Sequence, residues 1–428
     1  MKSRVNKLIN KIKKDSLMKG FSILFSGTVI TQIITLLLAP ILTRLYTPAQ
    51  FGINALFIAI LAIFGVVATL RLQFAIAITD CSKEKKALSV ICIFTSLIIS
   101  LLLLILILFY GELISYAFNI DSTNWLWLLP ISTFFLGIYE MLFQNLLSRK
   151  RYKLMAKVTI VKVTTQSVFQ IVLAFFNLGY MGLIIGNLIS YIIPVIIMIW
   201  VLNIRSTKLN LTKNYCFEVL RKYSDFPKYA FPAELTSITT YSMIPIVITY
   251  LFTSSITGYF SLANRLIGIP VGLFGNSLRQ VYIREASEEL TKKGTVKTSF
   301  IRTSKILVFI SVPTALCLFI FSPTFFKIVF GDEWIMSGVY VQVLILFFSA
   351  RLIVGPLIST VSIIGKQKSA LFVNLGILLG LMFLTIIFNY LNIHKPVLFL
   401  LLVSLIFSSI YLGFYCFMFK VIKKEGLK

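Results

Sequence analysis

Two arginines lie inside long apolar segments of the sequence, where a positive charge is costly. Arg351 lies near the middle of the segment 338–363, with no other ionisable residue within one helical turn, and Arg265 lies about nine residues, or about 13 Å, inside the segment 256–279. A charge at the centre of a bilayer costs about 2.5–3.5 kcal/mol on insertion scales. We therefore expect both guanidinium groups to face a polar cavity, where Arg351 would bind an anion. The alternative for Arg351 is a structural role, in which it bonds backbone carbonyls of a broken neighbouring helix.

A carboxylate and an ammonium group occur at matching depths in two consecutive apolar segments. Glu140 lies about eight residues before the end of the segment 125–147, and Lys162 lies about eight residues into the segment 154–176. Antiparallel helices joined by a short turn would place both groups about 12 Å deep. They form either a buried salt bridge or a protonatable carboxylate held beside a cation, as coupling to an ion such as H⁺ or Na⁺ requires.

Four further polar residues accompany these groups. Gln166 follows Lys162 by one helical turn, so the two form a polar stripe that either lines a cavity or bonds one helix to another. Glu234 is a second ion-coupling candidate, but it lies early in its segment, where a surface role competes evenly. Arg71 and Arg279 each end an apolar segment. They either only orient the chain or also meet an anionic head group at the cytoplasmic mouth of a cavity.

These residues need a scaffold of membrane-spanning helices. Of the 428 residues, 58% are hydrophobic and only 13% are charged, which a soluble chain of this length cannot bury in one core. A helical span needs about 20 mostly apolar residues. We therefore predict an all-α membrane protein with twelve transmembrane helices. The predicted spans are 20–42, 51–70, 87–109, 125–147, 154–176, 180–202, 229–252, 256–279, 306–326, 338–363, 369–390 and 396–419.

The basic residues alternate between the loops. With the N-terminus inside, 35 of the 41 Lys and Arg residues fall in inside segments, three fall in outside loops, and Lys162, Arg265 and Arg351 fall within spans. Basic residues gather in cytoplasmic loops, so we expect both termini to be cytoplasmic. The same asymmetry accounts for nearly all of the net charge of +26, which leaves no reason to expect nucleic-acid binding.

The two halves of the chain resemble each other weakly. Short motifs around Gly52 and Gly258 lie 206 positions apart, and each precedes a span that ends in an arginine. An even number of spans separates them, which indicates parallel six-helix lobes around a central cavity. We therefore predict a basic amphipathic helix, an N-lobe of six spans, a cytoplasmic linker, a C-lobe of six spans and a cytoplasmic tail. Their ranges are 1–19, 20–202, 203–228, 229–419 and 420–428.

Several kinds of site are excluded by what the chain lacks. It has one histidine, no HExxH motif and no GxxxxGK[ST] loop, so we expect no metal centre, no direct use of ATP and no enzyme activity. Its five cysteines form no CxxC pair and indicate no redox function. The short outside loops leave no room for an external catalytic domain.

Two stretches of the sequence resemble a known family. The first comprises Pro40, Thr43, Arg44, Tyr46, Pro48, Phe51 and Gly52. The second comprises Asp225-Phe226-Pro227, Pro245, Gly258-Tyr259-Phe260, Ala263-Asn264-Arg265, Ile269-Pro270 and Tyr282-x-Arg284-Glu285-Ala286. Together they are similar to the polysaccharide flippases of the Wzx type, which share a superfamily with multidrug exporters of the MATE kind and the lipid II flippase.

The resemblance implies transport and no cofactor beyond a possible coupling ion. Such a protein would carry an undecaprenyl-diphosphate-linked repeat unit of O-antigen (the polysaccharide of lipopolysaccharide) or capsule across the bacterial cytoplasmic (inner) membrane by alternating access. Its partners would be that glycan, the lipid bilayer and other polysaccharide assembly proteins. The matched motifs include Arg265 but not Arg351 or Lys162. The functional roles of Arg351 and Lys162 are inferred only from their burial within apolar segments. The alternative is a MATE-like ion-coupled exporter of small molecules.

Overall fold

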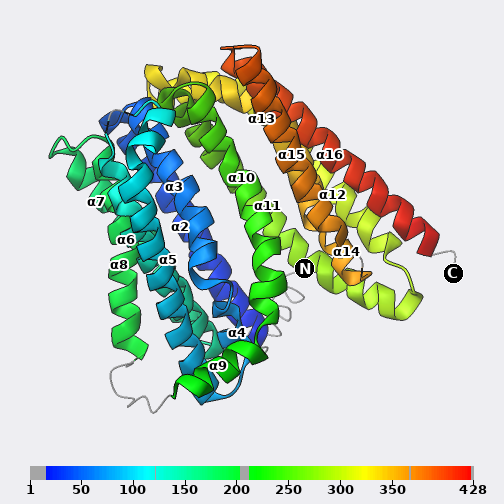
Figure 1. Cartoon of the computed structure of the whole chain (residues 1–428). Coiled ribbons are helices and arrows are strands. Elements are labelled where there is room, and N and C mark those ends of the chain that lie inside the picture. Colours follow the sequence, from blue (N-terminus) through cyan, green and yellow to red (C-terminus); the bar gives the residue numbers. More distant parts are fainter. Residues whose placement is uncertain (1–15, 121, 203–211, 366–367, 426–428) are drawn as a thin grey trace, which may run out of the picture. The chain divides into compact units, whose positions relative to one another are not determined.

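The computed structural model describes residues 16–120, 122–202, 212–365 and 368–425, and within these ranges the chain is helical and has no strand. In lipid the backbone polar groups must be satisfied within the segment, and a helix does this. Most of the predicted amphipathic helix 1–19, part of the linker and the end of the tail lie outside these ranges. The long helices (Figure 1) are α2 Ser16–Leu45, α3 Pro48–Thr69, α5 Ser82–Ala117, α6 Asn124–Ser148, α7 Tyr152–Ala174, α8 Tyr180–Leu202, α10 Phe231–Leu251, α11 Ser254–Lys293, α12 Lys297–Phe330, α13 Ile335–Leu357, α15 Lys368–Tyr390 and α16 Pro396–Glu425.

Each of the twelve predicted spans coincides with one of these helices. Among the described residues, nine helices are long and apolar enough to cross a membrane, which makes this an all-helical, multi-pass membrane protein. The other three are α7, α10 and α11, and polar side chains such as Lys162 and Arg265 lower their apolar character. The number of crossings therefore stays a prediction. The structure also divides one span, because α13 ends at Leu357 and the short helix α14, Ser359–Ile363, follows.

The chain forms two compact units. Residues 1–46 and 60–235 belong to the first unit, and residues 47–59 and 236–428 belong to the second. The predicted lobes differ from this division in two places. Residues 47–59, which include the start of α3, group with the C-terminal unit, and residues 229–235, predicted in the C-lobe, group with the first unit.

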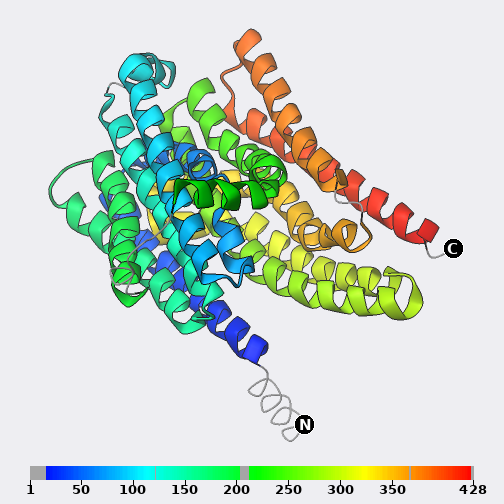
Figure 2. The ribbon, with the colours of Figure 1, turned by 60° about the horizontal axis from the view of Figure 1, so that its bottom comes forward.

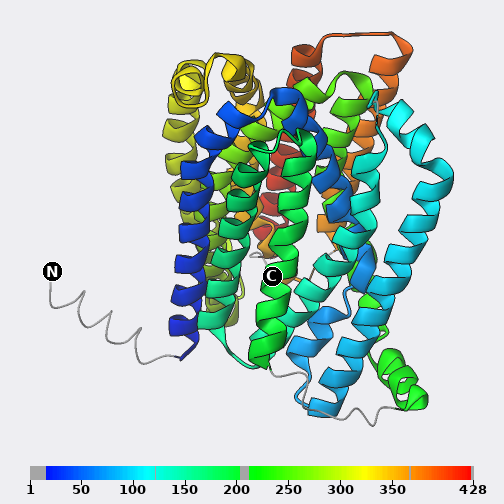
Figure 3. The same cartoon turned by 90° about the vertical axis from the view of Figure 1, so that its left-hand side faces the viewer.

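In the first unit, α2 packs on α7, α7 on α8, and α6 on both α5 and α8 (Figure 3). The linker contributes the short helix α9, Lys213–Lys222, which packs on α5. Val219 of α9 is buried in a hydrophobic core with Leu72 and Leu88. Glu84 at the start of α5 accepts hydrogen bonds from Lys222 at 2.5 Å and from the Tyr223 hydroxyl at 2.7 Å. These contacts attach the linker to the first unit.

In the second unit, α13 is central, because α11, α12 and α16 all pack against it. Phe347 of α13 contacts the rings of Phe407 and Tyr411 on α16. The long helices α11 and α12 form a hairpin through the turn at Gly294 (Figure 2). The helix that carries Arg351 therefore lies at the centre of this unit, with neighbours on several sides.

Gly52 of α3 and Gly258 of α11 meet in a reciprocal contact within the second unit. A Cβ at Gly52 would overlap the backbone oxygen of Ser254 and lie 3.0 Å from the Gly258 nitrogen. A Cβ at Gly258 would overlap the backbone oxygen of Pro48 and lie 3.2 Å from the Gly52 nitrogen. Both pairs of positions are 206 residues apart, so equivalent residues of the two halves make equivalent contacts. The weak repeat in the sequence thus corresponds to a local two-fold relation between α3 and α11.

The hairpin between α11 and α12 is closed by a carboxylate. Glu289 of α11 accepts hydrogen bonds from the backbone nitrogens of Thr298, at 3.0 Å, and Ser299, at 2.7 Å, in the first turn of α12. This is the role of an N-terminal cap, which satisfies donors that the helix cannot satisfy itself. Burial alone would raise the pKa of Glu289, but the hydrogen bonds from Ser299 and Thr298 lower it below its usual value.

We expect this cap to weaken in acid. A carboxyl group with a lowered pKa in the folded state stabilises the fold above its unfolded pKa of about 4.3, and the contribution is lost as the pH falls through the folded value. Glu289→Gln should lower the unfolding free energy at pH 7 by about 1 kcal/mol and should remove this part of the acid dependence. Thermal unfolding of the purified protein between pH 7 and pH 4 measures both effects. An unchanged pH dependence in the variant would contradict this role, and Glu288→Gln, at an exposed neighbour, is the control.

Candidate functional site

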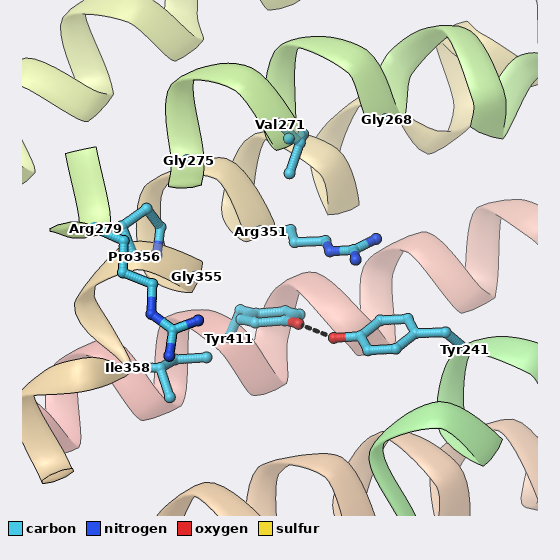
Figure 4. Close-up of a pocket in the computed structure, with 11 residues that line it drawn as sticks. Tyr241, Gly268, Val271, Gly275, Arg279, Arg351, Gly355, Pro356, Ile358 and Tyr411 are labelled. Carbon is cyan, nitrogen blue, oxygen red and sulfur yellow. Dashed lines mark hydrogen bonds between the residues drawn. The ribbon is translucent and has the colours of Figure 1, made fainter. Parts of the chain in front are cut away.

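A cavity of about 320 Å³ opens inside the second unit. Four helices supply its polar side chains: α10 carries Tyr241, α11 carries Arg279, α13 carries Arg351 and α16 carries Tyr411. Figure 4 shows these groups around the cavity. The structure thus brings together two of the six predicted binding residues, Arg351 and Arg279, from positions far apart in the sequence.

The Arg351 guanidinium is one of the polar groups that line the cavity. Its Cζ lies 4.4 Å from the centre of the Tyr241 ring, in a cation–π contact. Among the described residues, none forms an ion pair with Arg351 or accepts a hydrogen bond from it. Its N–H groups are therefore available to a ligand in the cavity. The alternative role of Arg351, in which it donates to backbone carbonyls of a broken neighbouring helix, is therefore not seen among the described residues.

Two tyrosines complete the side of the cavity beneath Arg351. The hydroxyls of Tyr241 and Tyr411 are 2.5 Å apart and share one hydrogen bond (Figure 4). Whichever hydroxyl accepts this bond keeps its own hydrogen to donate. Tyr411 is held in place by Phe347, with ring centres 6.2 Å apart. The pair therefore offers one hydroxyl donor beside an unpaired cation.

Arg279 lies elsewhere in the same cavity. Its Nε donates to the Ser359 hydroxyl at 3.2 Å, and Ser359 in turn donates to the carbonyl of Pro356. In Figure 4 the guanidinium groups of Arg279 and Arg351 are well separated and do not converge on one point. Arg265, although it is on the same helix as Arg279, does not line this cavity. Of the two arginines predicted to face a polar cavity, Arg351 therefore lines this one and Arg265 does not.

The predicted polar residues of the first unit form two other groupings. The Lys162 ammonium lies over the rings of Tyr139 and Tyr191, at 4.9 and 4.3 Å from their centres. Glu140 interacts electrostatically with Lys162 and Arg71, but it forms no ion pair with either in the described structure. The predicted Glu140–Lys162 salt bridge is therefore not formed, and the Lys162 ammonium contacts two tyrosine rings in its place.

Arg71 and Glu234 are brought together by the fold, which their positions in the sequence do not indicate. A nitrogen of Arg71 lies 3.3 Å from a carboxylate oxygen of Glu234, and the guanidinium stacks on Phe74 at 4.1 Å. Gln166 donates to Asn187 of α8 at 2.5 Å. Of the two alternatives for Gln166, lining a cavity or bonding one helix to another, the structure therefore shows the bond between helices.

The environment of Lys162 leads to a stability prediction. Removing the ammonium in Lys162→Ala leaves the half-buried Glu140 carboxylate without one of the two cations that stabilise it, and we expect a loss of about 1–3 kcal/mol of unfolding free energy. Neutralising the carboxylate as well, in Lys162→Ala with Glu140→Gln, should recover part of the loss. Thermal unfolding in detergent measures this. If the double variant is no more stable than Lys162→Ala, the two groups are not electrostatically coupled.

The sequence reasoning missed Tyr241, Tyr411 and three glycines of α11 that line the cavity. Tyrosines are common in membrane helices, so neither tyrosine carries a sequence signal. Gly268, Gly272 and Gly275 do carry such a signal, because their spacing places them on one face of a helix.

Among the described residues there is no cluster of three or more His, Cys, Asp or Glu side chains that could hold a metal ion.

The comparisons with known proteins agree with one another. The profile of a family described as "Polysaccharide biosynthesis protein" matches residues 41–338. No curated protein sequence matches the chain. Among solved structures, the lipid II flippase MurJ in an inward closed conformation is 19% identical, with a TM-score of 0.72, over 95% of this chain and 91% of that chain. An inward-facing multidrug resistance transporter of the MATE family and MOP superfamily is 14% identical, with a TM-score of 0.71, over 92% of this chain and 95% of that chain.

A third solved structure has a weaker likeness. It is a MOP superfamily transporter from Pyrococcus furiosus, which is 13% identical, with a TM-score of 0.56, over 95% of this chain and 94% of that chain. At these identities the three structures show a shared fold.

Proposed function

Because the chain belongs to the family of polysaccharide biosynthesis proteins, we propose that it is a flippase for undecaprenyl-diphosphate-linked oligosaccharide repeat units of O-antigen or capsule. It would move them from the inner to the outer leaflet of the bacterial cytoplasmic membrane by alternating access. The fold that it shares with a lipid II flippase supports this proposal. The asymmetry of its basic residues supports an orientation with both termini in the cytoplasm.

The observation that carries the proposal is the unpaired Arg351 guanidinium in the cavity of the second unit. A guanidinium is rigid and planar, and it binds two oxygens of a phosphate at once. A diphosphate is the charged part of the proposed substrate. Arg351 supplies N–H donors that match it, on a helix whose neighbouring residues are mostly apolar. Arg279, at another part of the same cavity, supplies a second cation.

The membrane potential favours the proposed direction. Moving a negative charge outward across a membrane that is negative inside gains about 2.3 kcal/mol per charge per 100 mV. An ion that returns inward would add to this. Glu140 and Glu234 are the candidates for coupling to such an ion, H⁺ or Na⁺.

A MATE-like exporter of small molecules is the second candidate, because transporters of that family share the fold. The chemistry of the cavity separates the two functions. An exporter of cationic compounds needs carboxylates at its site, but the described residues that line this cavity include two arginines and no acidic side chain. The cavity thus favours an anionic substrate.

The position of the lipid-linked glycan in the bilayer tests the proposal. In a strain that lacks this gene but has the rest of the glycan pathway, the undecaprenyl-linked oligosaccharide should accumulate on the inner leaflet. An impermeant glycan-cleaving or labelling reagent would then fail to reach it until the gene is restored. Normal exposure on the outer leaflet without the gene would rule out this function.

A further inference from the structure

The side of the cavity that faces α11 consists largely of glycine. Gly268, Gly272 and Gly275 lie at intervals of four and three residues, on one face of α11, and all three line the cavity. We refer to these three residues as the glycine face. In Figure 4 α11 crosses on one side of the Arg351 guanidinium, and the tyrosine pair lies on the other side. The guanidinium therefore lies between an aromatic side of the cavity and a side on which α11 presents three glycines and the Val271 side chain.

Helix packing does not explain the glycine face. A Cβ built at Gly268 or Gly272 meets no atom within 4 Å, and one at Gly275 meets only Pro356, at 3.9 Å. The packing glycines of the first unit are different, because a Cβ at Gly182 or Gly186 would lie 2.5 Å from a neighbouring side chain.

Backbone conformation does not explain these glycines either. The described glycines with positive φ are found at other positions, all of them in turns or loops. A glycine within a helix is less stable than an alanine, so three of them facing open space indicate another requirement.

We propose that the glycine face is the surface against which the first sugar of the lipid-linked glycan lies, and that it sets the size of the head group that the cavity admits. This inference rests on the proposed function. The N–H groups of a guanidinium point outward in its plane, so a phosphate bound to Arg351 lies beside the group, in the cavity that the glycine face also lines. The sugar joined to that phosphate must then lie within a bond or two of this space.

The chemistry of the surrounding groups suits a sugar ring. A pyranose has C–H faces, which pack against a bare helix backbone, and hydroxyls at its rim. The free hydroxyl hydrogen of the Tyr241–Tyr411 pair can bond such a hydroxyl or the phosphate. A prenyl chain would leave the Arg351 guanidinium and this hydroxyl without partners, which costs free energy when such groups are covered by apolar atoms. The head group is therefore the part of the substrate that fits here.

Four variants of the full-length protein test the assignment. Gly272→Leu fills the glycine face, Gly272→Ala adds one methyl group to space that is open, and Arg351→Ala removes the cation. Gly413→Leu is the matched control, because Gly413 is a helical glycine with nothing within 4 Å of its Cβ, and it does not line the cavity. Native mass spectrometry in detergent would measure the binding of undecaprenyl diphosphate, with and without the repeat unit extracted from the host. Gly268→Leu, on the same face, repeats the test if the first variant does not fold.

We expect Gly272→Leu to bind undecaprenyl diphosphate as well as the wild type does, but to bind the glycan-bearing form about tenfold more weakly. Gly413→Leu and Gly272→Ala should behave like the wild type, and Arg351→Ala should lose both lipids. Equal effects of Gly272→Leu on both lipids would overturn the role of the glycine face and leave the flippase function intact. Binding of neither lipid by the wild type would overturn both proposals. Loss of export in Gly272→Ala with normal binding would show that the glycines serve to bend α11, which would also overturn this inference.

Discussion

Replacing Arg351 by alanine is expected to abolish export of the lipid-linked glycan, while the protein reaches the membrane in normal amounts. The guanidinium has no ion-pair or hydrogen-bond partner among the described residues, so its removal leaves no buried charge unpaired. A bound diphosphate, by contrast, loses its bidentate donor. Truncating one partner of a buried, hydrogen-bonded charge pair costs about 2–5 kcal/mol, which corresponds to a loss in affinity of about thirtyfold or more.

The measurement is the amount of glycan on the outer leaflet, with the variant expressed in the deletion strain and its level in the membrane quantified. Arg351→Lys separates charge from geometry. A lysine keeps the charge but not the planar fork or the stacking on Tyr241, so we expect export between that of the alanine variant and that of the wild type. Arg284→Ala is the control, since Arg284 is exposed and pairs with Glu288. Wild-type export by Arg351→Ala would remove this residue from the site.

Replacing Gly52 by alanine should have the largest effect on stability. The added methyl group would overlap the backbone oxygen of Ser254, and a backbone atom cannot move aside as the end of a side chain can. Overpacking in a core typically costs about 1–3 kcal/mol and sometimes more, so a clash with backbone should cost about 3 kcal/mol or more of unfolding free energy. Gly258→Ala should behave in the same way, because its Cβ would overlap the backbone oxygen of Pro48.

The two substitutions should also be non-additive. Each of them separates α3 from α11 at the same crossing, so the second one finds the contact already broken. Thermal unfolding of Gly52→Ala, Gly258→Ala and the double variant measures this, with Gly413→Ala as a control at a glycine that meets nothing. If Gly52→Ala unfolds within about 0.5 kcal/mol of the wild type, the close crossing of α3 and α11 is not essential to the fold.

The sequence predicted the positions of the helices well, but it predicted the side-chain contacts between helices poorly. All twelve predicted spans coincide with helices, because the length of an apolar run is a local property and a membrane allows few other structures. The pairing of Lys162 was predicted less well. Matching depth made Glu140 its expected partner, but the helices are rotated so that Tyr139 and Tyr191 cover the ammonium group. Depth follows from the sequence, whereas rotation about a helix axis depends on how neighbouring helices pack.

The candidate site illustrates the same difference. Arg351 could be found from the sequence, since an isolated charge in an apolar run is visible there. Its surroundings could not be found, because Tyr241 and Tyr411 are 170 positions apart and have no sequence feature in common. Arg71 and Glu234 likewise form an ion pair only because the first unit brings the turn after α3 and the start of α10 together.

The sequence by itself determined the helical membrane class, the positions of the long helices, the family and the presence of cations within apolar segments. Each of these depends on composition, run length or short motifs, which are properties of neighbouring residues. Only the tertiary structure decided that Arg351 and Arg279 share a cavity, that Arg265 lies outside it, and that three glycines of α11 form one of its walls. Those facts depend on how helices that are far apart in the sequence cross and rotate against one another. No local pattern of residues specifies such packing.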